Sequence, residues 1–170
     1  MYKRQPHNVG FEVARALIER WDLGTPKKKF GGQLAEGRTG PGGPRVAVLL
    51  PQTFMNESGR SVSPARGSYR LDLDHILVLH DEIDLPFGDI RSRLGGGLAG
   101  HNGLKSLKAA LGSPDFHRVR IGVGRPASTD PEIVSRHVLG SWRQSKREVE
   151  DLIWAAADEA ERVLSQNGDA

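Results

Sequence analysis

The hydrophobic residues of this chain follow helical spacing near both ends. In the N-terminal part they lie three or four positions apart, at Phe11, Ala14, Leu17, Ile18 and Trp21. Asn8 precedes them as a candidate N-cap, so we predict an amphipathic helix from about Val9 to Trp21. A longer C-terminal helix is predicted to begin at Ser141 or Ser145 and to carry one apolar stripe, at Val149, Leu152, Ile153, Ala156, Ala160, Val163 and Leu164.

Strand patterns occupy the middle of the chain. The run from His75 to His80 is mostly apolar, as is typical of a central strand. Two further predicted strands, Ile90 to Leu94 and Arg118 to Val123, alternate apolar residues with arginines, which places the two arginines of each strand on one face. A turn-rich segment between Phe30–Arg38 and Arg45–Leu50 predicts a hairpin.

Shorter elements complete the pattern. Ser63 is predicted to cap a short helix that has Pro64 in its first position. Two more short helices are predicted, one around Leu104–Leu111 and one over Glu132–Leu139, whereas the basic run Lys27–Lys29 is predicted to be a solvated loop.

Strands that alternate with helices predict an α/β fold. The 170 residues match the length of one domain, and no internal repeat or change in composition marks a second. We therefore expect residues 1–170 to form a single three-layer domain, with a mixed, mainly parallel twisted sheet flanked by helices.

Composition limits the kinds of chemistry and the surroundings to be expected. The chain has no cysteine, which excludes disulfides, thiolate nucleophiles and cysteine metal ligands and favours a reducing, cytoplasmic setting. No apolar run is long enough to span a membrane, and the N-terminal residues are polar, unlike a signal peptide. A net charge of +3 is mildly basic and does not by itself require a nucleic-acid partner.

A glycine-rich segment between a predicted strand and a predicted helix is the first candidate binding site. Residues Ile90 to Lys105 read I-R-S-R-L-G-G-G-L-A-G-H-N-G-L-K, and glycines before a helix start favour a phosphate or a developing oxyanion. Gly95, Gly97 and Gly100 also fit the dinucleotide pattern G-x-G-x-x-G. No acidic residue ends the following strand, where Arg125 could favour a 2′-phosphate, so an NADP-binding protein remains an alternative.

Histidines and carboxylates are the second candidate. His7 and His101 each precede an asparagine at a predicted helix start, and Asp81 and Glu82 end a predicted strand, on opposite faces. Because cysteine and a G-x-S-x-G motif are absent, a histidine that activates water is favoured over covalent catalysis. A carboxylate at a strand end can orient such a histidine, whereas a metal site would need ligands from elsewhere, so no metal is expected. For Glu82 taken alone, the favoured interpretation is a surface ion pair.

Five motifs, taken together, resemble the bacterial peptidyl-tRNA hydrolase family. They occur in one order: H-N-V-G-F at His7, P-Q-T-F-M-N-E-S-G at Pro51, H-D-E-I-D-L-P-F-G at His80, G-G-G-L-A-G-H-N-G-L-K at Gly95 and F-H-R-V-R-I-G-V-G-R-P at Phe116. The resemblance implies a monomeric, cytoplasmic α/β enzyme without cofactor, membrane attachment or obligate protein partner. Its substrate would be peptidyl-tRNA, cleaved at the ester between the peptide and the terminal ribose.

The resemblance also implies roles for individual residues. His7 falls on the general base of the family and Asp81 on the aspartate that stabilises it. The residues that fall on substrate-binding positions are Tyr2, Phe54, Asn56 and Asn102. Arg93 and Arg120 fall where the family places basic residues that clamp tRNA phosphate.

The N-terminal residues depart from the family pattern. Family members begin with a hydrophobic strand and a G-L-G-N-P-G turn, whereas Met1 stands here directly before Tyr2, so we expect the first strand of the family fold to be missing. Pro6 also replaces an arginine that is usual before the histidine. A non-catalytic relative that binds tRNA or structured RNA is therefore the leading alternative to the enzyme.

Overall fold

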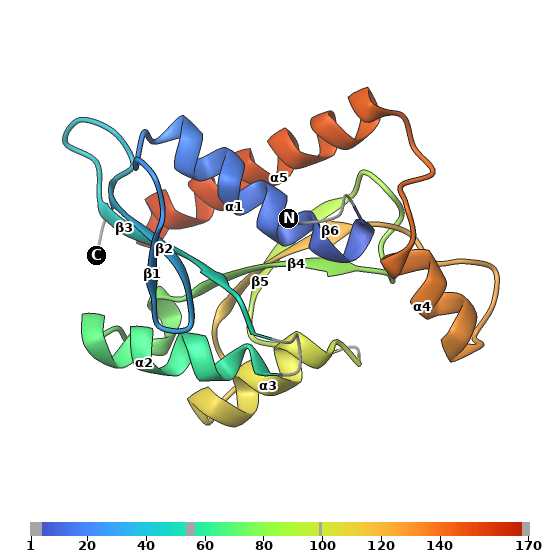
Figure 1. Ribbon diagram of the computed structural model, residues 1–170, viewed down its shortest axis with the longest axis horizontal. Coiled ribbons are helices and arrows are strands. Elements are labelled where there is room, and N and C mark those ends of the chain that lie inside the picture. Colours follow the sequence, from blue (N-terminus) through green and yellow to red (C-terminus); the bar gives the residue numbers. More distant parts are fainter. Residues whose placement is uncertain (1–4, 54–56, 99, 168–170) are drawn as a thin grey trace. The chain divides into compact units, whose positions relative to one another are not determined.

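The chain divides into two compact units in the computed structural model, which describes residues 5–53, 57–98 and 100–167 (Figure 1). The first unit comprises residues 1–17, 78–92 and 118–170, and the second comprises residues 18–77 and 93–117.

The first unit is an α/β structure whose main elements come from three separate parts of the chain. Some of these elements extend by a few residues into the second unit. They are η1 (Pro6–Asn8), α1 (Val9–Arg20), β4 (Leu77–Glu82), β5 (Ile90–Leu94), β6 (His117–Gly122), α4 (Pro131–Leu139) and α5 (Lys146–Asn167).

Its sheet has the strand order β4-β6-β5 and is mixed. Strands β4 and β6 are parallel: His117 donates its N–H to the carbonyl of Ile76 at 3.0 Å, and Val123, six residues later, donates to Glu82, also six residues later, at 3.1 Å. Strands β5 and β6 run antiparallel, with Gly122 donating to the carbonyl of Asp89 at 2.8 Å.

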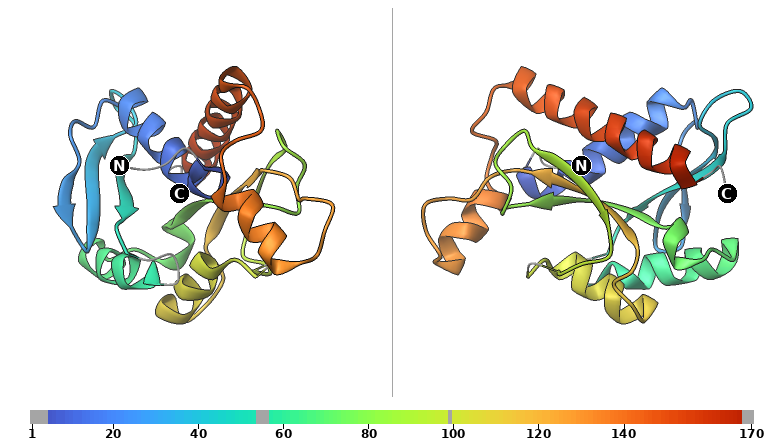
Figure 2. Two further views of the ribbon diagram at one scale, coloured as in Figure 1. Left: turned by 45° about the vertical axis from the view of Figure 1, so that its right-hand side comes forward. Right: turned by 180° about the vertical axis from the view of Figure 1, so that it is seen from behind.

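Helices α1 and α5 lie on the same side of this sheet in every view (Figure 2). Their buried side chains and those of β6 form the core: Val9, Val13, Val119, Ile121, Val149, Leu152 and Ala156.

The first turn of α1 rests directly on β4. A Cβ atom built on Gly10 would overlap the carbonyl oxygen of Leu79 and lie only 3.0 Å from its carbonyl carbon. Only glycine allows a helix backbone to approach a strand this closely. The helix that follows His7 is therefore held in a defined position against β4.

The second unit combines a small antiparallel sheet with two helices. Its elements are β1 (Lys27–Lys29), β2 (Gly32–Arg38), β3 (Arg45–Pro51), α2 (Gly59–Tyr69), η3 (Leu73–His75) and α3 (Asn102–Leu111). Strand β2 lies between β1 and β3, and Gln33 faces both Lys28 and Leu50. Helix α2 packs closely on α3, because Gly59 donates its N–H to Ser106 Oγ at 2.9 Å and has Ala110 beside its Cα.

The predicted α/β class, with sheets flanked by helices, is confirmed, and the sheet of the first unit is mixed as predicted. Two details differ. The described strands form two three-stranded sheets instead of one, and β1-β2-β3 is antiparallel instead of mainly parallel. A short hairpin connection brings β2 and β3 together locally, which allows antiparallel pairing without a crossover helix.

Two local predictions were wrong. Lys27–Lys29 is a strand, because its backbone pairs with Gly32–Leu34 while its side chains remain exposed. Pro64 lies inside α2 instead of in its first position, because the helix already begins at Gly59. Packing of that first turn against α3 outweighs the hydrogen bond lost at the proline.

No helix in the described part of the chain is both long enough and apolar enough to cross a membrane.

Candidate active site

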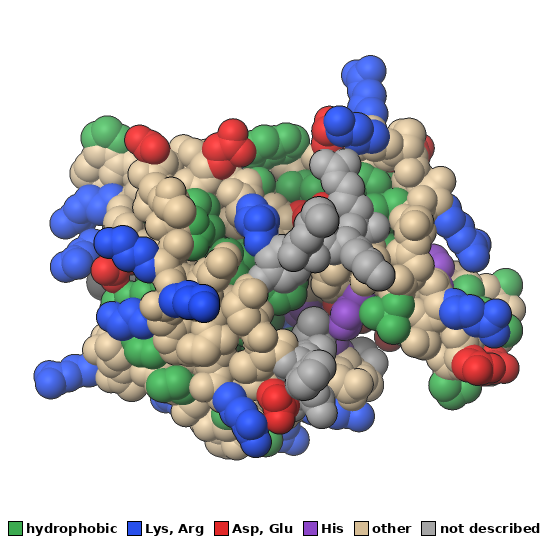
Figure 3. Space-filling view, viewed as in Figure 1, with side chains coloured by type: hydrophobic (Ala, Val, Ile, Leu, Met, Phe, Trp, Pro, Cys, Tyr) green, Lys and Arg blue, Asp and Glu red, His purple; other side chains and the backbone are tan. Residues whose placement is uncertain are grey.

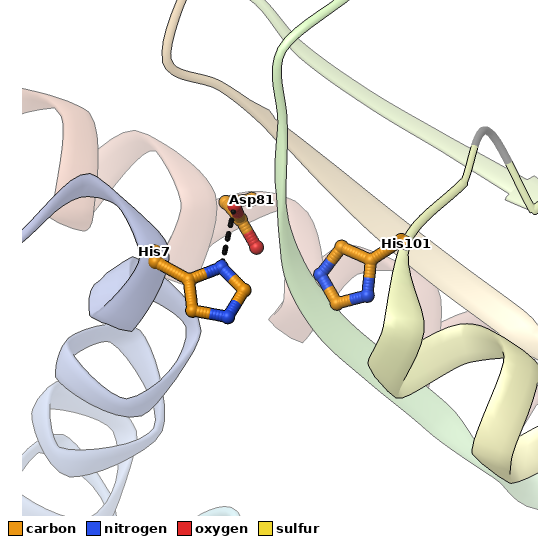
Figure 4. Close-up of side chains that lie close together, drawn as sticks. All are labelled: His7, Asp81 and His101. Atoms are coloured by element: carbon orange, nitrogen blue, oxygen red, sulfur yellow. Dashed lines mark hydrogen bonds and ion pairs between the residues drawn. The ribbon is translucent and has the colours of Figure 1, made fainter. Parts of the chain in front are cut away.

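His7 and Asp81 form a hydrogen-bonded pair within the first unit. His7 Nδ1 lies 3.0 Å from Asp81 Oδ2 (Figure 4). The carboxylate side chain is 6% exposed and the imidazole 22%, so the pair is sheltered while the ring remains accessible. The structure thus brings together the two residues for which a catalytic role was predicted.

Local sequence explains both positions. Pro6 stands at the start of η1, where its fixed φ angle suits the turn and its missing N–H costs nothing. Asn8 donates its N–H to the carbonyl of Gln5 at 3.0 Å, which closes the turn around His7. Asp81 lies near the carboxyl end of β4, where open α/β sheets commonly place their functional groups.

The carboxylate changes the acid–base behaviour of the histidine. The hydrogen bond to Asp81 raises the pKa of His7, burial of the ring lowers it, and the charge of Asp81 raises it further, with a net rise from 6.5. A carboxylate that accepts from Nδ1–H also fixes the tautomer in which Nε2 carries no proton. That tautomer is the one a general base requires.

Glu82 points to the other face of β4 and pairs with Arg120. Its Oε1 accepts from Arg120 Nε at 3.1 Å and from Nη2 at 2.7 Å. The Glu82 side chain is only 6% exposed, so the predicted surface ion pair is instead a buried one. Arg118 is likewise buried, at 1% exposure, because packing around β6 encloses the face on which alternation placed its arginines.

A second ion pair follows the same two strands. Arg125 donates to Asp84 Oδ1 from Nε at 3.2 Å and from Nη2 at 2.5 Å. Both side chains are exposed, at 41% and 46%. Arg125, which could have favoured a 2′-phosphate, thus already has an anionic partner.

The glycine-rich segment of the second unit contains Arg93, His101 and Asn102. His101 caps α3, because its Nδ1 accepts from the N–H of Leu104 at 3.3 Å, and Asn102 is the exposed first residue of that helix. Arg93 is exposed and donates to the carbonyl of Gly97 at 3.4 Å. Gly96, with φ of 98°, allows the Arg93 side chain to lie against the loop.

Three predicted substrate-binding residues lie outside the described residues: Tyr2, Phe54 and Asn56.

Basic side chains are spread over the molecular face shown in Figure 3. In the second unit, exposed cations follow the antiparallel sheet: Lys27, Lys28, Lys29, Arg38 and Arg45. None of these was predicted to contact the substrate.

One group of side chains in the second unit has ligand atoms close enough for a metal ion. Atoms of Asp72, Asp74 and His75 lie within 4.8 Å of one another. All three residues are exposed, and His75 Nδ1 is 2.9 Å from Asp74 Oδ1. An ordinary surface hydrogen bond accounts for this arrangement.

Two residues next to the pair were missed as contributors to its geometry. His80 was assigned to the apolar strand, yet its Nδ1 lies 2.8 Å from the backbone carbonyl oxygen of Asp81. Gly10 was noted only as part of the H-N-V-G-F motif, although it allows the close approach of α1 to β4. A glycine inside a predicted helix was the available signal, since glycine there needs a packing reason.

A histidine held by a strand-end carboxylate in an α/β fold is an arrangement suited to general-base hydrolysis, as found in the hydrolase class of enzymes. The sequence model of one family, described as "Peptidyl-tRNA hydrolase", matches residues 1–170. The chain therefore belongs to the peptidyl-tRNA hydrolase family.

Individual relatives agree with this assignment. The peptidyl-tRNA hydrolase of Novosphingobium aromaticivorans is 46% identical over 169 residues, covering 99% of this chain and 85% of its own. That of Halalkalibacterium halodurans is 43% identical and covers 94% and 85%. The crystal structure of peptidyl-tRNA hydrolase from Acinetobacter baumannii superposes with a TM-score of 0.83 at 38% identity, covering 98% of this chain and 83% of that one.

Proposed function

We propose that His7 is the general base with which this chain hydrolyses the ester between a peptide and the terminal ribose of tRNA, and that Asp81 holds and stabilises His7. The reaction itself is supported by membership of the peptidyl-tRNA hydrolase family, whose members are carboxylic ester hydrolases. The observation that supports the residue assignment is the 3.0 Å contact between His7 Nδ1 and Asp81 Oδ2.

The pair supplies what ester hydrolysis needs. Nε2 of His7 takes a proton from water, and the oxygen of that water attacks the ester carbonyl to give a tetrahedral oxyanion. The negative carboxylate of Asp81 stabilises the imidazolium that forms. When the C–O bond to the ribose breaks, the imidazolium returns its proton to the ribose oxygen, which releases tRNA. The peptide leaves as a carboxylic acid, which loses its remaining proton to solvent and becomes the carboxylate.

Substrate contacts are proposed for residues that fall on the family motifs. Asn56 and Asn102 would offer side-chain amides to the peptide, the 3′ end or the oxyanion, and Tyr2 and Phe54 would line the same binding region. Helix α3 begins at Asn102, whose exposed side chain is accessible to a substrate.

Arg93 and Arg120 are proposed to contact tRNA phosphate. Arg93 is exposed, which suits a phosphate contact. Glu82 engages Nε and Nη2 of Arg120, which leaves its Nη1 group as the donor toward a phosphate.

Hydrolysis of N-acetyl-aminoacyl-tRNA by the purified chain tests the proposal. His7→Ala should lower kcat by about 10² to 10⁴ without lowering the melting temperature much, because a positioned base contributes about that factor. Cleavage by His7→Ala at nearly the parent rate would remove His7 from the mechanism. Binding of tRNA by the parent chain without any hydrolysis would instead favour a non-catalytic RNA-binding relative.

We also propose that residues 1–170 act as one domain, as a monomer and in the cytoplasm. The family match over the whole chain supports the single domain. One cooperative unfolding transition and a sedimentation coefficient independent of concentration are the expected results.

A further inference from the structure

The backbone of β4 has an inner edge that pairs with β6 and an outer edge that does not. In a strand, the carbonyl groups of alternate residues point to opposite edges. The carbonyl of Glu82 accepts from Val123 and so faces β6. The carbonyls of Leu79 and Asp81 therefore face the outer edge of β4.

Two residues of the first unit cover this outer edge. Gly10 brings the backbone of α1 against the carbonyl oxygen of Leu79. The His80 imidazole lies against the next outward carbonyl, with Nδ1 at 2.8 Å from Asp81 O. A carbonyl oxygen only accepts, so His80 Nδ1 must carry the proton and donate it.

This hydrogen bond is shielded from water. His80 is 6% exposed and Asp81 is 5% exposed. A buried carbonyl that loses its donor pays the full cost of desolvation, so the peptide unit is expected to keep this orientation.

The peptide unit held in this way joins Asp81 to Glu82, and both carboxylates are engaged. Asp81 Oδ2 bonds to His7, and Glu82 Oε1 bonds to Arg120. Rotation of this peptide plane changes ψ of Asp81 and φ of Glu82, which moves one or both carboxylates relative to their partners.

We propose that His80 is a positioning residue for the hydrolytic reaction, which anchors the Asp81–Glu82 peptide plane and thereby aligns the Asp81 carboxylate with His7. The proposal rests on the role assigned to His7 above. It gives His80 no contact with substrate and no part in proton transfer.

Two substitutions at this position separate the hydrogen bond from the bulk of the side chain. His80→Leu fills a similar apolar volume but has no donor, whereas the side-chain amide of His80→Asn places an N–H close to the position of Nδ1. The pKa of His7 is measured for each variant by following its ring protons in NMR titrations, with His7→Asn used to assign the signal. Values of kcat and KM for N-acetyl-aminoacyl-tRNA are measured between pH 5 and 9.

His80→Leu should lower the pKa of His7 toward its ordinary value, because Asp81 is then less well aligned. The acidic limb of the kcat profile should move to lower pH, and its plateau should fall about five- to tenfold with little change in KM, as expected for the loss of one hydrogen bond. His80→Asn should restore both the His7 pKa and most of kcat.

A purely structural role predicts a different result. Fewer folded molecules would lower the plateau of His80→Leu without moving its acidic limb or the pKa of His7, and that outcome overturns the proposal. Equal losses in His80→Asn and His80→Leu also overturn it. If His80→Leu does not fold, His80→Gln replaces it, because its amide lies nearer the Nε2 position and should fail to align Asp81.

The NMR measurement needs no turnover. An inactive parent chain would remove the proposed function of His7 and leave the test of alignment intact, whereas an unchanged pKa of His7 in an active His80→Leu variant would remove only the positioning role.

Discussion

Gly10 and the carbonyl group of Leu79 are in such close contact that the first turn of α1 leaves no room for a side chain at this position. His7 lies two residues before the start of α1 and Asp81 lies two residues beyond Leu79, so we expect the contact between helix and strand to help set the distance between the two proposed catalytic residues.

Gly10→Ala is therefore expected to destabilise the protein, although alanine normally favours a helix. Overpacking should cost about 1 to 3 kcal/mol, and displacement of His7 from Asp81 should reduce kcat. Urea unfolding and ester hydrolysis measure the two effects.

Gly67→Ala is the matched control for this substitution. Gly67 also lies within a helix, but a Cβ atom there would meet nothing within 4 Å. The free energy of unfolding should rise by about 0.5 to 1 kcal/mol, as for an open helix site. Equal effects of the two substitutions would show that the contact at Leu79 does not matter.

Asp81→Asn should change the pH dependence of the reaction. Asp81 raises the pKa of His7, so loss of its charge should lower that pKa and move the acidic limb of kcat to lower pH. The plateau should fall as well, because the imidazolium is less stabilised. An acidic limb that stays in place after this substitution would assign the titration to another group.

Stability should depend on pH through the same pair. The pKa of His7 is raised above 6.5 in the folded chain, so the folded state binds the proton more tightly than the unfolded state. This contribution to the free energy of unfolding is complete below about pH 6.5 and is lost as the pH rises through the folded pKa. Parent and His7→Gln chains, unfolded in urea at pH 5.5 and pH 8.5, should therefore differ more at the lower pH.

Arg93→Ala should weaken tRNA binding without destabilising the fold. Loss of one phosphate contact is expected to lower the slope of log Kd against log salt concentration by about 1. A minimal ester substrate without the tRNA body should be cleaved at nearly the parent rate. Equal losses with both substrates would contradict a phosphate contact.

Arg120 should differ from Arg93, because its guanidinium also neutralises buried Glu82. Arg120→Ala is expected to lower the free energy of unfolding by about 2 to 4 kcal/mol, since removal of one partner leaves a buried charge. The double variant Arg120→Met with Glu82→Gln should recover much of that stability. No recovery would show that the pair does not carry the effect.

Tyr69 provides a spectroscopic check on the second unit. Burial and a 2.6 Å hydrogen bond to Glu36 raise the pKa of Tyr69 to about 12. The absorbance of the ionised Tyr69 phenol at 295 nm should therefore develop only well above pH 10 in the folded chain, and Tyr69→Phe should remove this part of the titration. Loss of a transition near pH 10 would mean that the phenol is not engaged with Glu36.

The hydrophobic pattern predicted most of the elements because their spacing is local. Ile90–Leu94 was predicted with the bounds that the structure has, and the helix predicted from Val9 to Trp21 ends one residue earlier. Lys27–Lys29 was missed because pairing with β2 supplies the stabilisation, whereas its own residues carry no apolar alternation.

The sequence pattern predicted that His7 lies at a helix start and Asp81 at a strand end. Their pairing depends on how segments distant in the sequence pack together. The resemblance to a family supplied the pairing, and the structure places the atoms in contact. Burial of Arg118 and of the Glu82–Arg120 pair was missed, since alternation along a strand says which face a side chain takes but not whether that face is covered.

The three exposed lysines of β1 have a consequence for neighbouring molecules. Strand β1 ends the antiparallel sheet of the second unit, so one side of its backbone has no partner strand among the described residues. An unpaired strand edge is a template on which another copy of the chain could add a strand, and lysines there oppose such addition by charge repulsion. Replacing the lysines by threonine would keep the strand and remove this protection against edge-to-edge aggregation.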